Sequence, residues 1–438
     1  MKRPSLAVAL ALSCAVLSGG LVACGDDDDE GGSGGGGGGG GDAALDLVIG
    51  NSVPLTGDLA DFGPPGDKAA QVAISEIEKA IMESGRDDTV ELVTVDNETN
   101  PQAAVQAARS ASADGATCLA GAWASADTIP TARSVSIRDE ILQISPASTA
   151  DEISTLEDDG FLNRTAPPDR FQGPTLANVI AEELGGAEGK TVSVGARNDA
   201  YGNGLAETFT AAWEELGGEL TGEPVIYDPT QPSYDSEAQD IVAGNPDAIV
   251  IVDFPETFVK VGPALVRTGK FDGAKTYVTD GLVSADLTAD PGPEVMSGIR
   301  GTAPGAPDDD QASKAFGTLY ESSPPNDVER QVFDAQNFDA VVLCYLAAVS
   351  AGSTEGADMA DVVRDISAPG GEQFTWEQLP EAIDALAAGD DIDYQGASGP
   401  IDMNEDGDAT AGVYDIYEFK GASAELLPID EIEVAAAE

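Results

Sequence analysis

The residue types of this 438-residue chain limit the chemistry that it could perform. It contains 79 acidic residues and no histidine, which excludes histidine-based catalytic triads and histidine-ligated metal sites. Two carboxylates could hydrolyse a glycosidic bond, but with so many acids almost any two look paired. We therefore expect a binding protein and no enzyme, with an exported carboxylate-based hydrolase as the remote alternative.

Two loops partly match phosphate- or calcium-binding motifs. The run from Gly185 to Thr191 has one residue too few for a phosphate loop, and it precedes a strand where such a loop follows one. The run from Asp402 to Asp408 matches half of a calcium loop, but Val413 stands where the twelfth-position glutamate belongs. We expect turns at both places, with calcium at 402–408 as an alternative, and we expect no cofactor.

Ser125 lies where a ligand carboxylate could bind. It follows an apolar run at 118–121 and begins a predicted helix. Ligands of open parallel sheets bind beyond the carboxyl ends of the strands, and the first N–H groups of a helix have no partner within it. Ser125 could equally be the N-cap of that helix.

The elements that must position Ser125 alternate between strand and helix patterns. Strands are expected at 47–51, 90–96, 118–121 and 142–145, with helices at 68–82, 101–113 and 126–136 between them. The rhythm repeats with strands at 191–195, 225–227, 248–252 and 276–279 and helices at 205–216, 235–243 and 257–268. This α/β pattern predicts two doubly wound parallel-sheet lobes.

The last third of the chain is less regular. We expect helices at 312–320, 333–351, 359–366 and 376–388. A hairpin should follow, pairing 399–401 with 413–419 across a turn rich in Asn, Asp and Gly.

The N-terminus has the pattern of an export signal. Lys2 and Arg3 precede an apolar stretch of about twelve residues, which is too short to cross a bilayer. Its end, Leu-Val-Ala before Cys24, resembles the bacterial lipoprotein signal, in which that cysteine is lipidated. We expect a signal peptide at 1–23, a lipid anchor at Cys24 and an acidic, glycine-rich tether over 24–44. An ordinary secretory signal is the alternative.

Charge and cysteine content narrow the partners. The formal net charge of −58 excludes nucleic acid and a polybasic membrane surface as partners, so membrane attachment rests on the lipid alone. Self-repulsion of this size predicts a melting temperature that rises between dilute buffer and molar salt. Cys118 and Cys344 remain in the folded part, and a disulfide and two unpaired buried thiols are equally open.

Five short runs resemble the extracytoplasmic leucine/isoleucine/valine-binding proteins, in the order of that family. They are Asn-Ser-Val-Pro-Leu-Thr-Gly at 51–57 with Phe-Gly at 62–63, Gly-Ala-Trp-Ala-Ser at 121–125, Ile-Ser-Pro-Ala-Ser-Thr at 144–149, Arg-Thr-Ala-Pro at 164–167 with Gln-Gly at 172–173, and Tyr-Gly-Asn-Gly-Leu-Ala at 201–206. The resemblance extends from residue 45 to about residue 419.

The resemblance implies a type I periplasmic-binding-protein fold, with two lobes joined by three crossovers and a ligand cleft between them. Lobe 1 would comprise 45–166 and 303–391, and lobe 2 would comprise 167–302 and 392–430. Residues 431–438 would form a tail.

The same resemblance implies the roles of four residues at the cleft. Ser125 would bind the carboxylate of an amino acid. Thr149 and the backbone carbonyl of Ala147 would bind its ammonium group, and Asp280 from lobe 2 would pair with that ammonium.

Aromatic residues complete the implied pocket. Phe62 and Tyr201 are candidates for ligand contact, and Trp123 would narrow or cap the side-chain pocket. At the end of one lobe 2 strand either Asp253 or Phe254 faces the cleft, and Phe254 is the candidate. Phe333 would line the lobe 1 wall.

The implied function is that of a substrate-binding lipoprotein of an ABC importer. A branched-chain or related amino acid would be captured by hinge closure and delivered to the permease subunits by a monomeric protein. The alternatives are a lipid-anchored sensor of the same fold, or a binder of an amide, urea or an aromatic acid.

Overall fold

The computed structural model describes residues 44–307 and 310–435. The chain divides into two units, Met1–Gly41 and Asp42–Glu438, and all described residues belong to the second. The expected signal peptide, the lipid anchor at Cys24 and the tether up to residue 43 lie outside the described residues. No helix within 44–307 or 310–435 combines the length and the apolar character needed to span a bilayer.

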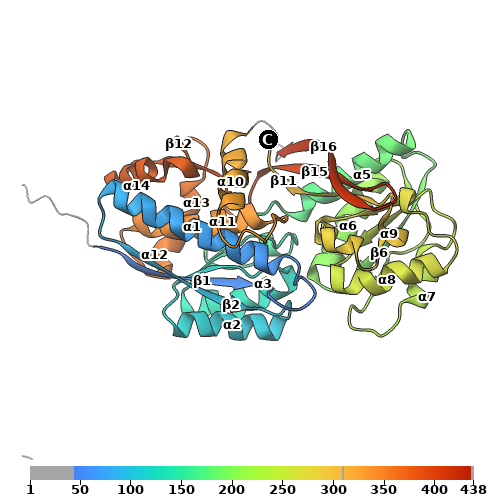
Figure 1. Cartoon of the computed structure of the whole chain (residues 1–438), viewed down its shortest axis with the longest axis horizontal. Coiled ribbons are helices and arrows are strands. Elements are labelled where there is room, and N and C mark those ends of the chain that lie inside the picture. Colours follow the sequence, from blue (N-terminus) through green and yellow to red (C-terminus); the bar gives the residue numbers. More distant parts are fainter. Residues whose placement is uncertain (1–43, 308–309, 436–438) are drawn as a thin grey trace, which may run out of the picture. The chain divides into compact units, whose positions relative to one another are not determined.

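The first sheet is parallel throughout, with the strand order β2-β1-β3-β4-β5. Its strands are β1 (Asp46–Val53), β2 (Thr89–Asp96), β3 (Cys118–Ala120), β4 (Leu142–Ser145) and β5 (Leu162–Arg164). The helices of this part are α1 (Gly63–Ser84), α2 (Pro101–Ala113), α3 (Ser125–Thr131) and α4 (Ile137–Asp139). One face packs against α1 and the later helix α11, and the other packs against α2 (Figure 1).

Local signals explain where the first helices begin and end. Asn100 caps α2 by accepting hydrogen bonds from the N–H groups of Gln102 and Ala103, and Pro101 occupies the first turn, where no N–H is needed. Pro130 lies inside α3, and the chain continues as a π-helical turn, Ala132–Ser136. The single helix expected at 126–136 is therefore two segments.

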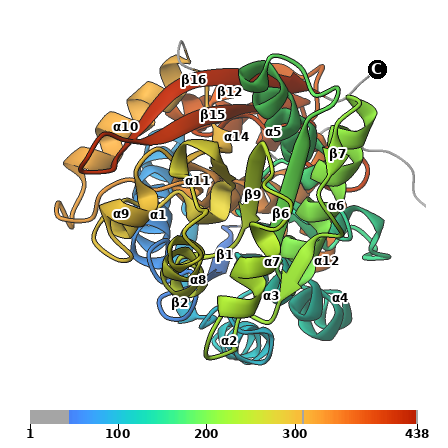
Figure 2. The same cartoon turned by 90° about the vertical axis from the view of Figure 1, so that its right-hand side faces the viewer.

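The second sheet has the order β16-β15-β11-β10-β9-β6-β7, with β8 also paired to β6. Figure 2 shows β6 and β9 side by side, with β15 and β16 in red. Its strands are β6 (Thr191–Arg197), β7 (Glu219–Leu220), β8 (Val225–Tyr227), β9 (Ala248–Val252), β10 (Thr276–Val278), β11 (Arg300–Gly305), β15 (Ala411–Lys420) and β16 (Glu425–Ala435). Its helices are α5 (Asp169–Leu184), α6 (Ala200–Glu215), α7 (Asp235–Ile241), α8 (Pro255–Arg267) and α9 (Pro293–Met296).

The remaining elements add a helical layer and a small sheet to the first half. The helices are α10 (Gln311–Ser322), α11 (Asp334–Ala351), α12 (Gly356–Ala360), α13 (Val363–Ile366) and α14 (Leu379–Ala388). The small sheet has the order β12-β13-β14 and consists of Glu372–Thr375, Ile392–Gly396 and Gly399–Pro400. Ile392 and Tyr394 pack in the same core cluster as α1 and α11.

The eight strands and six helices expected before residue 280 are all present, and the two doubly wound sheets confirm the fold class. The expected hairpin of 399–401 with 413–419 is wrong. β14 pairs with β13, and β15 pairs with β11 and β16. The alternating apolar residues of β15 suit any antiparallel partner, so its pattern could not identify the right one.

The chain passes three times between the first half, which includes the small sheet, and the half built on the second sheet, after β5, β11 and β14. Since β13 and β14 pack with the first core, we propose that the third boundary between lobes lies near residue 410 and not at 391/392. By the same argument β11 belongs with the second sheet up to residue 305.

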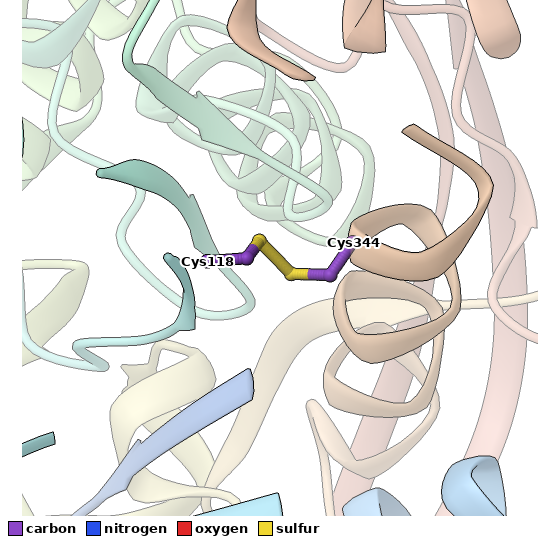
Figure 3. Close-up of a disulfide and its surroundings, with 2 residues drawn as sticks. All are labelled: Cys118 and Cys344. Carbon is purple, nitrogen blue, oxygen red and sulfur yellow. A yellow bond between two sulfur atoms is a disulfide. The ribbon is translucent and has the colours of Figure 1, made fainter. Parts of the chain in front are cut away.

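A disulfide joins Cys118 of β3 to Cys344 of α11, with 5.9 Å between the two Cα atoms (Figure 3). Both residues are fully buried in the first core. The structure therefore selects the disulfide over the pair of unpaired thiols. It ties the central part of the first sheet to the helix that covers it.

Candidate ligand-binding site

A small cavity of about 20 Å³, with room for about one water molecule, lies where loops from the two sheets meet. From the first sheet come the loops after β1, β3 and β4, and from the second the segments after β6, β9 and β10. Each loop follows the carboxyl end of a parallel strand, which is where ligands of such sheets bind. The lining residues are Leu59, Phe62, Trp123, Ala124, Ser125, Ala147, Tyr201, Phe254, Asp280, Gly281 and Phe333.

Ser125 begins α3 on the first wall of the cavity. The N-cap is Ala124, which makes no side-chain cap bond, so Ser125 is not the cap. Its Oγ instead accepts a hydrogen bond from the N–H of Ala150 at 3.2 Å. Ser125 thereby joins the loop after β3 to the loop after β4, which carries Ala147.

Trp123 and Phe333 form the apolar part of this wall. Their rings meet edge to face at 6.4 Å. A Cβ at Gly66 of α1 would lie 2.3 Å from the Trp123 ring, so the indole can occupy this place only because residue 66 is glycine. Phe333, the residue before α11, has a φ of 71°, a left-handed conformation that is uncommon for a large side chain.

Tyr201 and Phe254 form the opposite wall. Their rings stack at 5.1 Å, and the Arg197 guanidinium lies 3.7 Å from the centre of the Phe254 ring. Asp253 does not line the cavity, since its carboxylate accepts hydrogen bonds from Tyr227 Oη and from the N–H of Phe254, both at 2.8 Å. Of the two neighbours it is Phe254 that faces the cavity.

Asp280 places a buried carboxylate on the same wall. Its Oδ1 accepts a hydrogen bond of 2.9 Å from Tyr201 Oη, which also lies 2.6 Å from Thr279 Oγ1. Burial raises the pKa of Asp280 to about 6, although Tyr201 and the Gln172 amide act in the opposite direction. No cation of the described residues forms an ion pair with it. A cationic ligand group would be favoured here.

Thr149 does not line the cavity. It is buried in the loop that also carries Ala147, and its hydroxyl faces Asp169, the first residue of α5, without a well-aligned hydrogen bond. Both oxygens of Asp169, and Oε1 of Gln172, likewise have no hydrogen-bond partner among the described residues. Burial raises the pKa of Asp169 well above its ordinary value, and the charge of Asp280 adds to this effect.

Two polar contacts join the halves at the edge of the cavity. Arg197 Nη2 lies 2.9 Å from Asp58 Oδ2, and Ser284 Oγ donates to Asp61 Oδ2 at 2.7 Å. Asp58 and Asp61 belong to the loop after β1, whereas Arg197 and Ser284 belong to the second half. Burial raises the pKa of Asp61, and Asp286 and Glu256 add to the effect.

A second buried carboxylate has a different environment. Asp408, at the end of the 402–408 turn, is bound by Arg164 at 2.8 Å and by Arg170 at 2.8 Å. Burial alone would raise the pKa of Asp408, but the two arginines and Ser154 lower it below its ordinary value. The turn is closed by a bridge between Met403 and Ala409, and within 44–307 and 310–435 no cluster of three or more acidic or cysteine side chains could hold a metal ion.

The structure thus brings together seven of the eight residues expected at the ligand, together with Phe333. Thr149 is the exception. Neither Leu59 nor Asp169 was expected at the site from the sequence pattern. The Gln172-Gly173 pair, three residues after Asp169, was one of the runs that resemble the family. Nothing in the pattern indicated that Asp169 would be buried beside Asp280.

Comparison with known proteins agrees with this architecture. A family model described as periplasmic binding protein matches residues 46–423. A chemotactic signal transduction system substrate-binding protein, BasB, of Halobacterium salinarum is 24% identical over 367 residues, 82% of this chain and 84% of that protein. A leucine-, isoleucine-, valine-, threonine- and alanine-binding protein of Pseudomonas aeruginosa is 26% identical over 325 residues, 74% of this chain and 83% of that protein.

Solved structures show the same fold. The leucine-binding protein LivK of Thermotoga maritima has a TM-score of 0.71 at 23% identity, covering 88% of this chain and 98% of that one. LivJ of Streptococcus pneumoniae, in complex with isoleucine, has a TM-score of 0.70 at 18% identity, covering 88% and 99%. A solute-binding protein of R. palustris in complex with 4-hydroxybenzoate has a TM-score of 0.71 at 16% identity, covering 89% and 98%. The match over residues 46–423 shows that the chain belongs to the periplasmic binding protein family, with the type I fold of the leucine-, isoleucine- and valine-binding proteins.

Proposed function

We propose that this chain is an extracytoplasmic substrate-binding lipoprotein that captures an amino acid and delivers it to the permease of an ABC importer. The observation that supports this most is the position of Asp280. It is a buried carboxylate without an ion-pair partner among the described residues, and it shares a cavity with Ser125 and Ala147. Such a carboxylate favours a cation, and an α-amino acid supplies one beside a carboxylate.

The proposed binding mode uses both walls of the cavity. The Ser125 hydroxyl and the first N–H groups of α3 would receive the ligand carboxylate. The Ala147 carbonyl and Asp280 would receive the ammonium group. Rings contributed by both halves would surround the side chain, namely Phe62, Trp123, Tyr201, Phe254 and Phe333.

Capture would proceed by hinge closure. The walls belong to different sheets, and the chain crosses between the two halves at three places. A ligand on the first wall would be enclosed when the second wall approaches, and the Asp58–Arg197 and Asp61–Ser284 contacts would form at that step.

Calorimetric titration with matched ligands tests this proposal. At least one amino acid of a panel should bind with measurable heat; the panel is leucine, isoleucine, valine, threonine and alanine. 4-Methylpentanoate, which is leucine without its ammonium group, should bind far more weakly because Asp280 would lose its counter-charge. Asp280→Asn should reduce the difference in affinity between leucine and 4-methylpentanoate. Ser125→Ala should weaken the binding of leucine and leave the binding of the cationic 3-methylbutylamine unchanged. If 4-methylpentanoate bound as well as leucine, the proposed ammonium subsite would be wrong.

A sensor of the same fold is the second candidate, and one comparison favours it. The relative from Halobacterium salinarum is named as a substrate-binding protein of a chemotactic signal transduction system. Deleting the gene separates the two functions. An importer subunit is required for uptake of the labelled amino acid, whereas a sensor is required for chemotaxis toward it with uptake intact.

An aromatic acid is the other alternative ligand, since a solved structure of this fold contains 4-hydroxybenzoate. That ligand carries no cation, so binding it here would leave Asp280 uncompensated or protonated. The same titration should therefore give no heat with 4-hydroxybenzoate. Heat with this compound and none with any amino acid would replace the proposed ligand class.

The lipid anchor is part of the proposal and rests on the residues before Cys24. Replacing Cys24 with serine should move the protein from the membrane fraction to the soluble fraction. Metabolic labelling with a fatty acid should be lost in the same variant. Membrane retention of Cys24→Ser would contradict this mode of attachment.

A further inference from the structure

Five polar side chains form a buried group next to the cavity. Asp280 lines the cavity, while Asp169, Thr149, Gln172 and Tyr414 are buried and each interacts with Asp280 or Asp169. Four atoms or pairs of atoms in this group have no hydrogen-bond partner among the described residues, namely Thr149 Oγ1, both oxygens of Asp169, Gln172 Oε1 and Tyr414 Oη. Buried polar groups are normally satisfied, so a cluster of unsatisfied ones requires an explanation.

Most of the unsatisfied atoms are acceptors. The two oxygens of an ionised Asp169 and Oε1 of Gln172 can only accept, whereas the hydroxyls of Thr149 and Tyr414 can each donate one O–H. Three acceptor oxygens and two O–H donors leave this group short of N–H or O–H donors. A proton on one carboxyl group supplies one such donor, and a primary ammonium group supplies three.

The charges around Asp169 leave this excess of acceptors uncompensated. Arg164 is the cation that acts on it most, but its guanidinium binds Asp408 and the carbonyl oxygens of Ser148 and Ala150. Asp151, which is partly exposed, lies 3.4 Å from Arg170. On the side of α6, a Cβ at Gly204 would lie 3.3 Å from Asp169 Oδ2, so that helix presents no side chain at this position. Tyr201 and Tyr414 feel the charges of both Asp169 and Asp280.

We propose that Asp169 is a second carboxylate of the ammonium subsite, and that Asp169 and Asp280 hold a proton in the free protein which the cationic group of the ligand displaces. This inference rests on the proposed function. Two carboxylates in one buried site do not both ionise readily without a cation. A carboxylic acid at Asp169 would donate to Thr149 Oγ1. When the ammonium group enters, the carboxyl O–H bond breaks, and the proton passes to the buffer.

The proposal predicts that binding releases a proton. The heat of leucine binding at about pH 6 should differ between phosphate and Tris, in proportion to their ionisation enthalpies, and should correspond to release of up to about one proton. Between about pH 5.5 and pH 7.5 the affinity should increase with pH, because the binding-competent form is the ionised one. Release should decrease towards the upper end of this range.

Two variants test whether Asp169 carries the proton that is released. Asp169→Asn should remove most of the proton release while leucine still binds through Asp280. The matched control is Asp151→Asn, which removes a neighbouring carboxylate that is partly exposed and already faces Arg170. This variant should release as many protons on leucine binding as the unmodified protein does. An infrared band of a protonated carboxyl group should disappear when leucine is added, and this band should be absent from Asp169→Asn.

The outcomes separate this inference from the proposed function. Equal heats in the two buffers at about pH 6, with leucine bound, would overturn the inference and leave the proposed function standing. Unchanged release in Asp169→Asn would remove Asp169 from the subsite. If Asp169→Asn did not fold, the buffer comparison on the unmodified protein would still decide whether a proton is released. Absence of heat with every amino acid would instead overturn the proposed function.

Discussion

Two buried carboxylates, Asp408 and Asp280, show how the same group can serve stability or binding. Asp408 is held by Arg164 and Arg170, and its pKa is lowered. Asp280 receives a hydrogen bond from a tyrosine and has no cationic partner among the described residues, and its pKa is raised to about 6. Asp408 therefore finds its positive charges within the protein and stabilises the fold. The ionised Asp280 becomes favourable only when a bound ligand supplies a positive charge.

The largest expected effect comes from removing the cation that belongs to Asp408. Arg164→Met leaves a buried carboxylate without its main partner and should lower the free energy of unfolding by about 3–5 kcal/mol. Urea denaturation measures this. Arg170→Met is the matched control, because the Arg170 side chain is 36% exposed and its loss should cost much less. Similar costs for both variants would contradict the central place given to Arg164.

The corresponding change at Asp280 should act on binding. Asp280→Asn keeps the shape of the side chain and removes the charge, so it should weaken amino-acid binding by about 2–5 kcal/mol. The free energy of unfolding without ligand should not fall. Asp253→Asn serves as comparison, since that buried carboxylate faces Tyr227 and not the cavity. A loss of stability in Asp280→Asn without a loss of affinity would reverse the roles inferred for the two carboxylates.

Stability should also depend on pH in opposite directions for the two groups. Because the pKa of Asp280 is raised, the native state binds more protons than the unfolded state between about pH 4 and pH 6. The contribution of Asp280 therefore lowers the free energy of unfolding by roughly 3 kcal/mol as the pH rises through that window. The lowered pKa of Asp408 gives stability above pH 4 that is lost on acidification. Urea midpoints of the unmodified protein and Asp280→Asn should therefore converge near pH 4 and separate near pH 7. Parallel profiles would contradict this.

The smallest expected effect concerns Asp61 at the edge of the cavity. Asp61→Asn can still accept the hydrogen bond of Ser284, but it removes a negative charge near Asp286 and Glu256. Closure should become easier, so ligand affinity should rise by about 0.2–1 kcal/mol in dilute buffer. Molar salt should remove the difference by screening. An increase that persisted in molar salt would have a different cause.

Much of the fold could be predicted from the sequence because the strands of a parallel sheet are short apolar runs between helices. The early alternation located eight of the ten strands up to β10, and it missed the short strands β5 and β7. The C-terminal third was harder, since its strands pair with partners far away in the chain. β15 lies between β11 and β16, and no local pattern states this.

Most of the candidate site could be predicted because its motifs follow strands. Ser125, Ala147, Tyr201 and Asp280 each follow one, and each lines the cavity. Asp169 was missed because its importance comes from burial and from its neighbours, which depend on how α5 packs. The signal peptide, the anchor at Cys24 and the effect of salt on melting remain predictions.

The disulfide between Cys118 and Cys344 has a consequence for following the protein in cells. Both sulfur atoms lie in a core that assembles only when residues 226 positions apart have come together, and such bonds form in oxidising compartments. The bond therefore records both folding and arrival beyond the cytoplasm. Alkylating reagents applied under denaturing conditions should label these two cysteines in molecules that are still inside the cell and leave them unlabelled in exported ones. The fraction of molecules in which the pair is oxidised therefore measures the progress of export.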